Sequence, residues 1–361
     1  MPYQINRLAR RIPLWLSALL LAACASAPPT PAPPAPPVYP PPPDEPRFIF
    51  ERTLRYSSNV EPPRAGAGLR RFATGVDETL KGLVKPFGVV ASQGRVYVTD
   101  SVQRAVVLFD IGGQRYQEIG RTPPGELAKP IGIDLSEIMG ELYVADASLR
   151  RIVVFDLQGQ FKRYIGGPNL FKRPSGVAVS ADGQRVYVID TGGVDTDAHH
   201  LYLFDTATAD HLKTVGTRGG EPGQFNLPVQ LTTSDDGRVH VVDKGNFRVQ
   251  TFSREGDYLG TFGTIGRYPG QFFSPKGIAT DRDGNIYVID TAFGNVQIFT
   301  ADGQLLMVLG QRGQSSAPGN YMLPAGIDVD ETGRIYVADQ FFRKVDIYRP
   351  IGAAPPDAGN R

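Results

Sequence analysis

The chain has 361 residues, and its 38 Lys and Arg against 37 Asp and Glu leave no basic excess for non-specific binding to nucleic acid or anionic lipid. Its 41 Gly and 31 Pro favour many turns over long helices. The one Cys excludes an intramolecular disulfide, and with only four His it also excludes a Cys-based zinc module.

The N-terminus has the pattern of a targeting segment. Arginines in residues 1–11 precede an apolar stretch, residues 12–23, that is too short to span a bilayer comfortably. The stretch runs into "LAAC", which resembles the lipobox of bacterial lipoproteins, where a peptidase cuts before the Cys and lipid is attached to its sulfur. We expect residues 1–23 to be a signal peptide and Cys24 to be lipidated. The alternative is an ordinary secretory signal that contains a Cys by chance.

This resemblance implies a place in the cell envelope. In the enterobacterial sorting pattern, Ala25 rather than Asp favours the outer membrane, with the protein facing the periplasm or the cell surface. Residues 24–46 then form a proline-rich tether. Because proline fixes φ and lacks an N–H, this segment is predicted to be neither helix nor paired strand, but a polyproline-II spacer of roughly 3 Å per residue.

Four short sequence phrases then recur along the chain. A Pro followed two residues later by Gly, or once by Gln, occurs at Pro86, Pro130, Pro174, Pro228, Pro275 and Pro324. A phrase similar to "YV-x-D" ends at Asp100, Asp146, Asp190, Asp243, Asp290 and Asp339. Six such repeats with short β-rich segments predict an all-β, six-bladed propeller over residues 47–350, followed by a disordered tail at 351–361.

The fifth repeat shows the parts of one blade. Strands are predicted at 277–280, 285–290, 295–300 and 304–310, joined by tight turns and one loop. The sixth repeat has no fourth strand. The strand-like segment 47–56, which belongs to no repeat, is predicted to complete that blade and close the ring.

The phrases resemble the NHL repeat family of six-bladed propellers. The resemblance is strongest in "GQFFSPKGIATDRDGNIYVID" and "LPAGIDVDETGRIYVADQ". It implies a propeller in which the loops between second and third strands and the connections between blades share one face, the loop face. The opposite turn face has tight turns that leave little room for recognition. The fold does not by itself imply a function.

The six repeated Asp residues lie at the start of loops on the loop face. A ring of carboxylates could bind a cation, but a motif present in every blade is better explained as architecture. We therefore expect each Asp to cap its own loop by accepting backbone N–H bonds.

The third repeat departs from the others by an insertion, "DTGGVDTDAHHLYLF". It places Asp195, Asp197, His199 and His200 in one loop. Carboxylate and imidazole ligands together could coordinate a divalent metal, either Ca²⁺ or Zn²⁺. The alternative is a solvated polar loop. Outside this insertion, His240 takes the place that Tyr has in the "YV" phrase of the other repeats, and we expect its side chain to have a packing role.

Two further departures concern the innermost strands. Asp134 and Asp328 replace small or apolar residues near the central channel, where they could hold a metal or a cationic ligand together, or contact channel water. Lys85, Lys129 and Arg173 directly precede the motif Pro of repeats one to three. These three residues, here called the basic arc, could receive an acidic partner or be scattered, solvated side chains.

We find no nucleophile-elbow, zinc-protease or P-loop motif. The sequence predicts a non-catalytic envelope scaffold lipoprotein that presents its loop face to a protein, protein complex or polymer. We expect a monomeric propeller, no nucleic-acid partner and no obligatory cofactor. The alternative is a metal-assisted lyase or hydrolase with its site at the central channel.

Overall fold

The computed structural model describes residues 35–63, 81–193 and 195–353. The chain divides into Met1–Ala35 and Pro36–Arg361, and the fold described below belongs to the second unit. The predicted signal peptide, Cys24 and most of the predicted tail lie outside the described residues. No helix among the described residues is long and apolar enough to cross a membrane.

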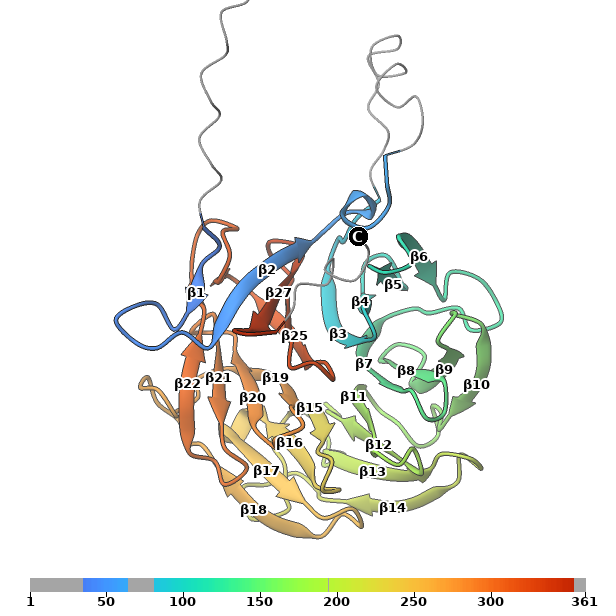
Figure 1. Cartoon of the computed structure of the whole chain (residues 1–361). Coiled ribbons are helices and arrows are strands. Elements are labelled where there is room, and N and C mark those ends of the chain that lie inside the picture. Colours follow the sequence, from blue (N-terminus) through green and yellow to red (C-terminus); the bar gives the residue numbers. More distant parts are fainter. Residues whose placement is uncertain (1–34, 64–80, 194, 354–361) are drawn as a thin grey trace, which may run out of the picture. The chain divides into compact units, whose positions relative to one another are not determined.

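Six antiparallel sheets form a ring, which confirms the predicted six-bladed propeller (Figure 1). Blades one to three consist of β3 (Pro86–Ser92), β4 (Arg95–Asp100), β5 (Ala105–Asp110) and β6 (Arg115–Ile119); β7 (Pro130–Ser136), β8 (Glu141–Asp146), β9 (Arg151–Asp156) and β10 (Phe161–Ile165); and β11 (Pro174–Val179), β12 (Arg185–Asp190), β13 (His200–Asp205) and β14 (His211–Val215). Blades four and five consist of β15 (Pro228–Thr233), β16 (Val239–Asp243), β17 (Arg248–Phe252) and β18 (Tyr258–Phe262); and β19 (Pro275–Thr280), β20 (Ile286–Asp290), β21 (Asn295–Phe299) and β22 (Leu305–Leu309).

The second strand of each blade is buried on both faces because neighbouring blades cover it. In β20, the sequence IYVID is buried at every position. Its β-branched and aromatic side chains suit a pleated, covered strand. The preceding turn ends at Gly284, whose φ of 79° is a conformation that glycine adopts without strain.

The sixth blade is completed by the N-terminal segment, as the sequence predicted. Its strands are β25 (Pro324–Val329), β26 (Ile335–Asp339), β27 (Lys344–Pro350) and β2 (Phe48–Leu54), in that order from the centre outward. The register pairs Phe50 with Tyr348 and Leu54 with Val345. The ring is therefore closed by hydrogen bonds between distant parts of the chain.

The boundary predicted at residue 46 is wrong for the part of the tether that the structure describes. Val38–Tyr39 forms a short strand, β1, on the outer side of β2. The Tyr39 hydroxyl donates to the Pro318 carbonyl at 3.0 Å, and its ring meets that of Tyr348 edge-on at 5.3 Å. Val38 and Tyr39 both carry the N–H that proline lacks, so this pair can join a sheet inside a proline-rich segment.

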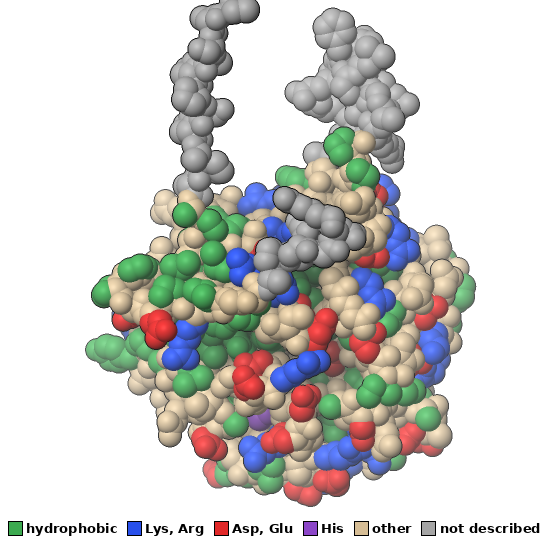
Figure 2. All heavy atoms as spheres, in the orientation of Figure 1, with side chains coloured by type: hydrophobic (Ala, Val, Ile, Leu, Met, Phe, Trp, Pro, Cys, Tyr) green, Lys and Arg blue, Asp and Glu red, His purple; other side chains and the backbone are tan. Residues whose placement is uncertain are grey.

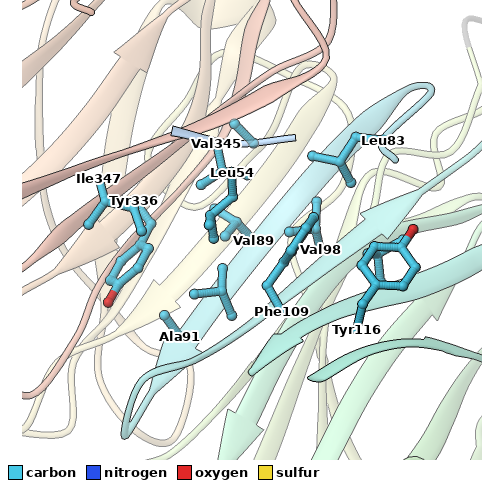
Figure 3. Close-up of a cluster of buried hydrophobic side chains, with 13 residues drawn as sticks. Leu54, Leu83, Val89, Ala91, Val98, Phe109, Tyr116, Tyr336, Val345 and Ile347 are labelled. Atoms are coloured by element: carbon cyan, nitrogen blue, oxygen red, sulfur yellow. The ribbon is translucent and has the colours of Figure 1, made fainter. Parts of the chain in front are cut away.

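The described apolar core consists of six clusters, each shared by two neighbouring blades. Figure 3 shows the cluster at the closure, where Leu54 of β2 lies with Val345 of β27 and Val89 of β3. Leu54, Val345 and Val98 are fully buried there. Because no blade covers its own faces, the ring is the unit that folds.

Two short 3₁₀ turns, η2 (Ser57–Asn59) and η3 (Lys244–Asn246), and one small parallel pair, β23 (Gln311–Arg312) with β24 (Asn320–Tyr321), lie in the connections. Figure 2 shows acidic and basic side chains interspersed over the face in view, with hydrophobic side chains gathered over the region of β2 and β22.

Candidate binding face and central channel

The six repeated Asp side chains are loop caps, as predicted. In blade one, Asp100 Oδ2 accepts the backbone N–H groups of Val84 and Lys85 at 2.6 and 2.9 Å. Its Oδ1 accepts those of Val102 and Gln103 at 3.1 and 3.0 Å. All six carboxylates are fully buried. Each one joins the start of an innermost strand to the loop after the second strand, which fixes the loop face.

The two adjacent His residues of the insertion contact backbone groups through their ring nitrogens. His199 is fully buried, and its Nδ1 accepts the Leu227 N–H at 3.1 Å while its Nε2 lies 3.2 Å from the Gly193 carbonyl. The His200 Nδ1 lies 2.8 Å from the Gly216 carbonyl. Asp195 and Asp197 are exposed. Backbone groups therefore lie against three of the four ring nitrogens of this pair, and within the described residues the four predicted ligands are not gathered into one metal-ligand set.

The described ranges contain no group of three or more His, Cys, Asp or Glu side chains that could hold a metal ion. The expected packing role of His240 is confirmed. Its Nδ1 lies 3.0 Å from Thr251 Oγ1, and burial lowers its pKa to about 4, so the ring is neutral at pH 7.

Asp134 and Asp328 line one narrow cavity of about 40 Å³ in the central channel. Each carboxylate bridges to the innermost strand of the next blade: Asp134 Oδ2 accepts the Val179 N–H and Asp328 Oδ2 accepts the Ala91 N–H, both at 2.7 Å. Their first structural role is thus to join adjacent blades. A cavity of this size has room for a few water molecules.

The channel changes the acidity of both groups. Burial raises the pKa of Asp134 to about 7 and that of Asp328 to about 8, and the Asp134 charge adds to the increase at Asp328. Both side chains have some accessible surface, but a channel this narrow excludes bulk water, so desolvation still disfavours their charged forms. The pair therefore supplies proton donors as well as acceptors near neutral pH.

The basic arc lies on the loop face as predicted. Lys85, Lys129 and Arg173 are exposed, and no side-chain hydrogen bond or ion pair to another described residue holds any of them. Their backbone is rigid, because each donates its N–H to the repeated Asp of its own blade. Each of three consecutive blades thus presents one cation of the basic arc on a fixed backbone.

Sequence reasoning missed a fourth cation, Lys276. It is the residue after the motif Pro of blade five, and its Nζ lies 4.5 Å from the centre of the Phe87 ring of blade one. Burial lowers the pKa of Lys276 to about 8, and the charges of Lys244 and Lys85 add to this decrease while Asp339 opposes it. The available signal was a charged residue at a position that is apolar or small in the other five repeats.

The loop face also exposes large apolar side chains. Val102 is 57% and Phe341 56% accessible, and Val84, Phe273 and Leu323 are exposed too. All five lie in loops after second strands or directly before innermost strands. An apolar set beside unpaired cations is a combination that favours association.

The expectation that the turn face has little room is wrong. A groove of about 380 Å³ lies there between blades five and six. Its walls include Phe48 at the start of β2, Leu306 and Met307 of β22, and the turns 281–285 and 330–333. The start of β2, the strand that completes blade six, contributes one wall of this groove, which the tight turns alone would not predict.

Comparison with known proteins agrees with this fold. Residues 83–188 and 279–349 match the family model DUF5128, which is described as a 6-bladed beta-propeller. A segment of 45 residues is 51% identical to the human E3 ubiquitin-protein ligase TRIM32, but it covers 12% of this chain and 7% of that protein. The protein is thus a six-bladed β-propeller.

Solved structures give the same result. A Bacteroides thetaiotaomicron protein of unknown function has a TM-score of 0.59 at 17% identity, over 83% of this chain and 76% of its own. A Xanthomonas campestris gluconolactonase has 0.58 at 16%, over 89% and 99%. A catalytically inactive virginiamycin B lyase from Staphylococcus aureus has 0.54 at 16%, over 73% and 94%. Propellers of this shape therefore include enzymes and proteins without an assigned function.

Proposed function

We propose that the protein is a non-catalytic binding module of the cell envelope, whose loop face takes an anionic protein or polymer partner. The observation that carries this proposal is the basic arc, in which Lys85, Lys129 and Arg173 are exposed without an ion pair to any described residue. Surface cations without partners speed the encounter with an oppositely charged partner and orient it.

The position of the arc supports the same proposal. Binding residues concentrate on loops that a rigid scaffold holds, and the buried Asp caps provide that rigidity here. The exposed apolar side chains of the loop face, such as Val102 and Phe341, would supply contact area that a purely ionic surface lacks. The enzymes among the structural neighbours share the fold at under 25% identity, which supports no common activity.

We further propose that the propeller is of the NHL type and that lipidated Cys24 anchors it to the outer membrane. The repeated phrases and the lipobox-like "LAAC" support this proposal. A mass measurement of the mature protein tests the anchor. We expect acyl chains on Cys24 and their loss, together with membrane partition, in Cys24→Ser; a parent protein without acyl mass would contradict it.

Cross-linking from defined positions tests the binding face. A photo-reactive amino acid is placed at Val102 or Phe341 on the loop face, and at Leu306 on the turn face as a control of similar exposure. In intact cells, we expect the two loop-face positions to capture one common partner and Leu306 to capture none. Capture of the common partner from Leu306 alone would contradict the proposal and would direct attention to the groove on the turn face.

A further inference from the structure

Lys276 occupies a special position at the mouth of the central channel. It follows Pro275 at the start of β19, where the innermost strands converge. The equivalent residues of the other blades carry no charge: Phe87, Ile131, Ser175, Val229 and Ala325. Ala325 of the intervening blade six is small and fully buried, and the Lys276 side chain lies over Phe87 of blade one.

The surroundings of this ammonium group are unfavourable without a further ligand. Its charged neighbours include two cations, Lys244 and Lys85, and one anion, Asp339. The Asp339 carboxylate already accepts the N–H groups of Met322 and Leu323 at 2.8 and 3.0 Å. Within the described ranges, the Lys276 Nζ has no hydrogen bond and no ion pair, only the ring of Phe87. A half-buried charge among like charges is costly unless an opposite charge joins it.

We propose that the channel mouth, formed by Lys276, Lys244, Lys85 and the Phe87 ring, binds a carboxylate group carried by an acidic segment of a partner protein. This inference rests on the proposed function and names the chemistry of its partner. One carboxylate would complete the charge balance at Lys276. Neighbouring acidic residues of the same segment would face the rest of the basic arc.

The apolar part of the loop face favours a protein segment over a simple anion. Val84 directly precedes Lys85, and Leu323 and Phe341 belong to blade six, which lies between Lys276 and Phe87 in the ring. These exposed side chains can contact apolar residues that flank acidic ones in a polypeptide. Inorganic phosphate has no apolar group to contact them, so binding of a polypeptide segment can be distinguished by experiment from binding of phosphate.

The test uses the folded protein with ¹³C-dimethylated lysines, so that each lysine can be titrated by NMR. Hexaglutamate is the probe, and hexaglutamine and inorganic phosphate are the controls. We expect hexaglutamate to raise the pKa of Lys276, because a nearby anion favours the charged form. We expect Lys276→Met to weaken hexaglutamate binding at least tenfold. The control Lys213→Met, on β14, removes an ion pair with Asp257 and should leave the binding unchanged.

Three results of the titration would overturn the inference: no effect of hexaglutamate on Lys276, an equal effect of hexaglutamine, or an effect of phosphate without one of hexaglutamate. A melting temperature of Lys276→Met at or above that of the parent shows that a loss of binding is not a loss of fold. If Lys276→Met binds like the parent while loop-face cross-linking still captures a partner, this inference fails and the proposed function stands. If loop-face cross-linking also captures no partner, the inference and the proposed function are both contradicted.

Discussion

At the scale of single residues, the repeat separates architecture from candidate function. The Asp present in every blade is buried and fully used in capping, whereas the informative residues are those that break the pattern. Lys276 breaks it in blade five, and Asp134 and Asp328 break it near the channel. Residues whose environment disfavours their charged state often lie at functional sites, because stability and binding make different demands.

This view predicts that Lys276 costs stability. Its pKa in the folded state, about 8, lies below the ordinary lysine value of 10.5, so between these pH values the unfolded chain binds more protons. In the parent, the titration of Lys276 should therefore make the free energy of unfolding rise with pH across this window. Lys276→Met lacks this contribution. At pH 7 we expect the variant to be more stable by about 1–3 kcal/mol.

Urea unfolding at pH 7 and above pH 10 measures this difference. The advantage of Lys276→Met should shrink as Lys276 loses its proton in both states of the parent. A variant that is less stable than the parent at pH 7, or a difference that does not depend on pH, would show that Lys276 is already compensated in the folded protein.

At the scale of elements, the closure of the ring depends on β2. This strand pairs with β27, and the Thr53 hydroxyl donates to Asp346 Oδ1 at 2.7 Å, next to the buried Lys344–Asp346 ion pair. Leu54 is fully buried between blades six and one. We expect Leu54→Ala to lower the free energy of unfolding by about 2–5 kcal/mol, through lost burial and a cavity at the closure.

Leu306→Ala is the matched control, because this leucine is 44% exposed on an outer strand. Its replacement should cost less than about 1 kcal/mol. Chemical denaturation of both variants gives the comparison. Equal losses would mean that β2 is an appendage of the sixth blade and does not hold the ring together.

The elements also show what the sequence could and could not predict. Repeat spacing predicted the blades, and the missing fourth strand predicted the place of β2, because both follow from local patterns. The pairing of Val38–Tyr39 was missed, since proline-rich composition outweighed two residues able to join a sheet. The contact between Lys276 and Phe87 joins blades five and one across the channel mouth, and no local pattern contains it.

At the scale of the whole molecule, the two faces differ in kind. The loop face combines the basic arc with exposed apolar side chains, whereas the turn face has a groove lined by apolar, acidic and basic residues. The His199 and His200 rings hold the insertion to the backbone around it. The central claim of this account is that the loop face is the working surface.

Charge reversal tests that claim most directly. Lys129→Glu combined with Arg173→Glu changes two exposed residues of the basic arc, and Asp302→Lys changes an exposed residue on the turn face. All three proteins should melt at about the same temperature, since none of these side chains holds an ion pair to a described residue. Partner capture in intact cells should then be lost in the double variant and retained in Asp302→Lys. Retained capture in the double variant, with loss in Asp302→Lys, would contradict the account.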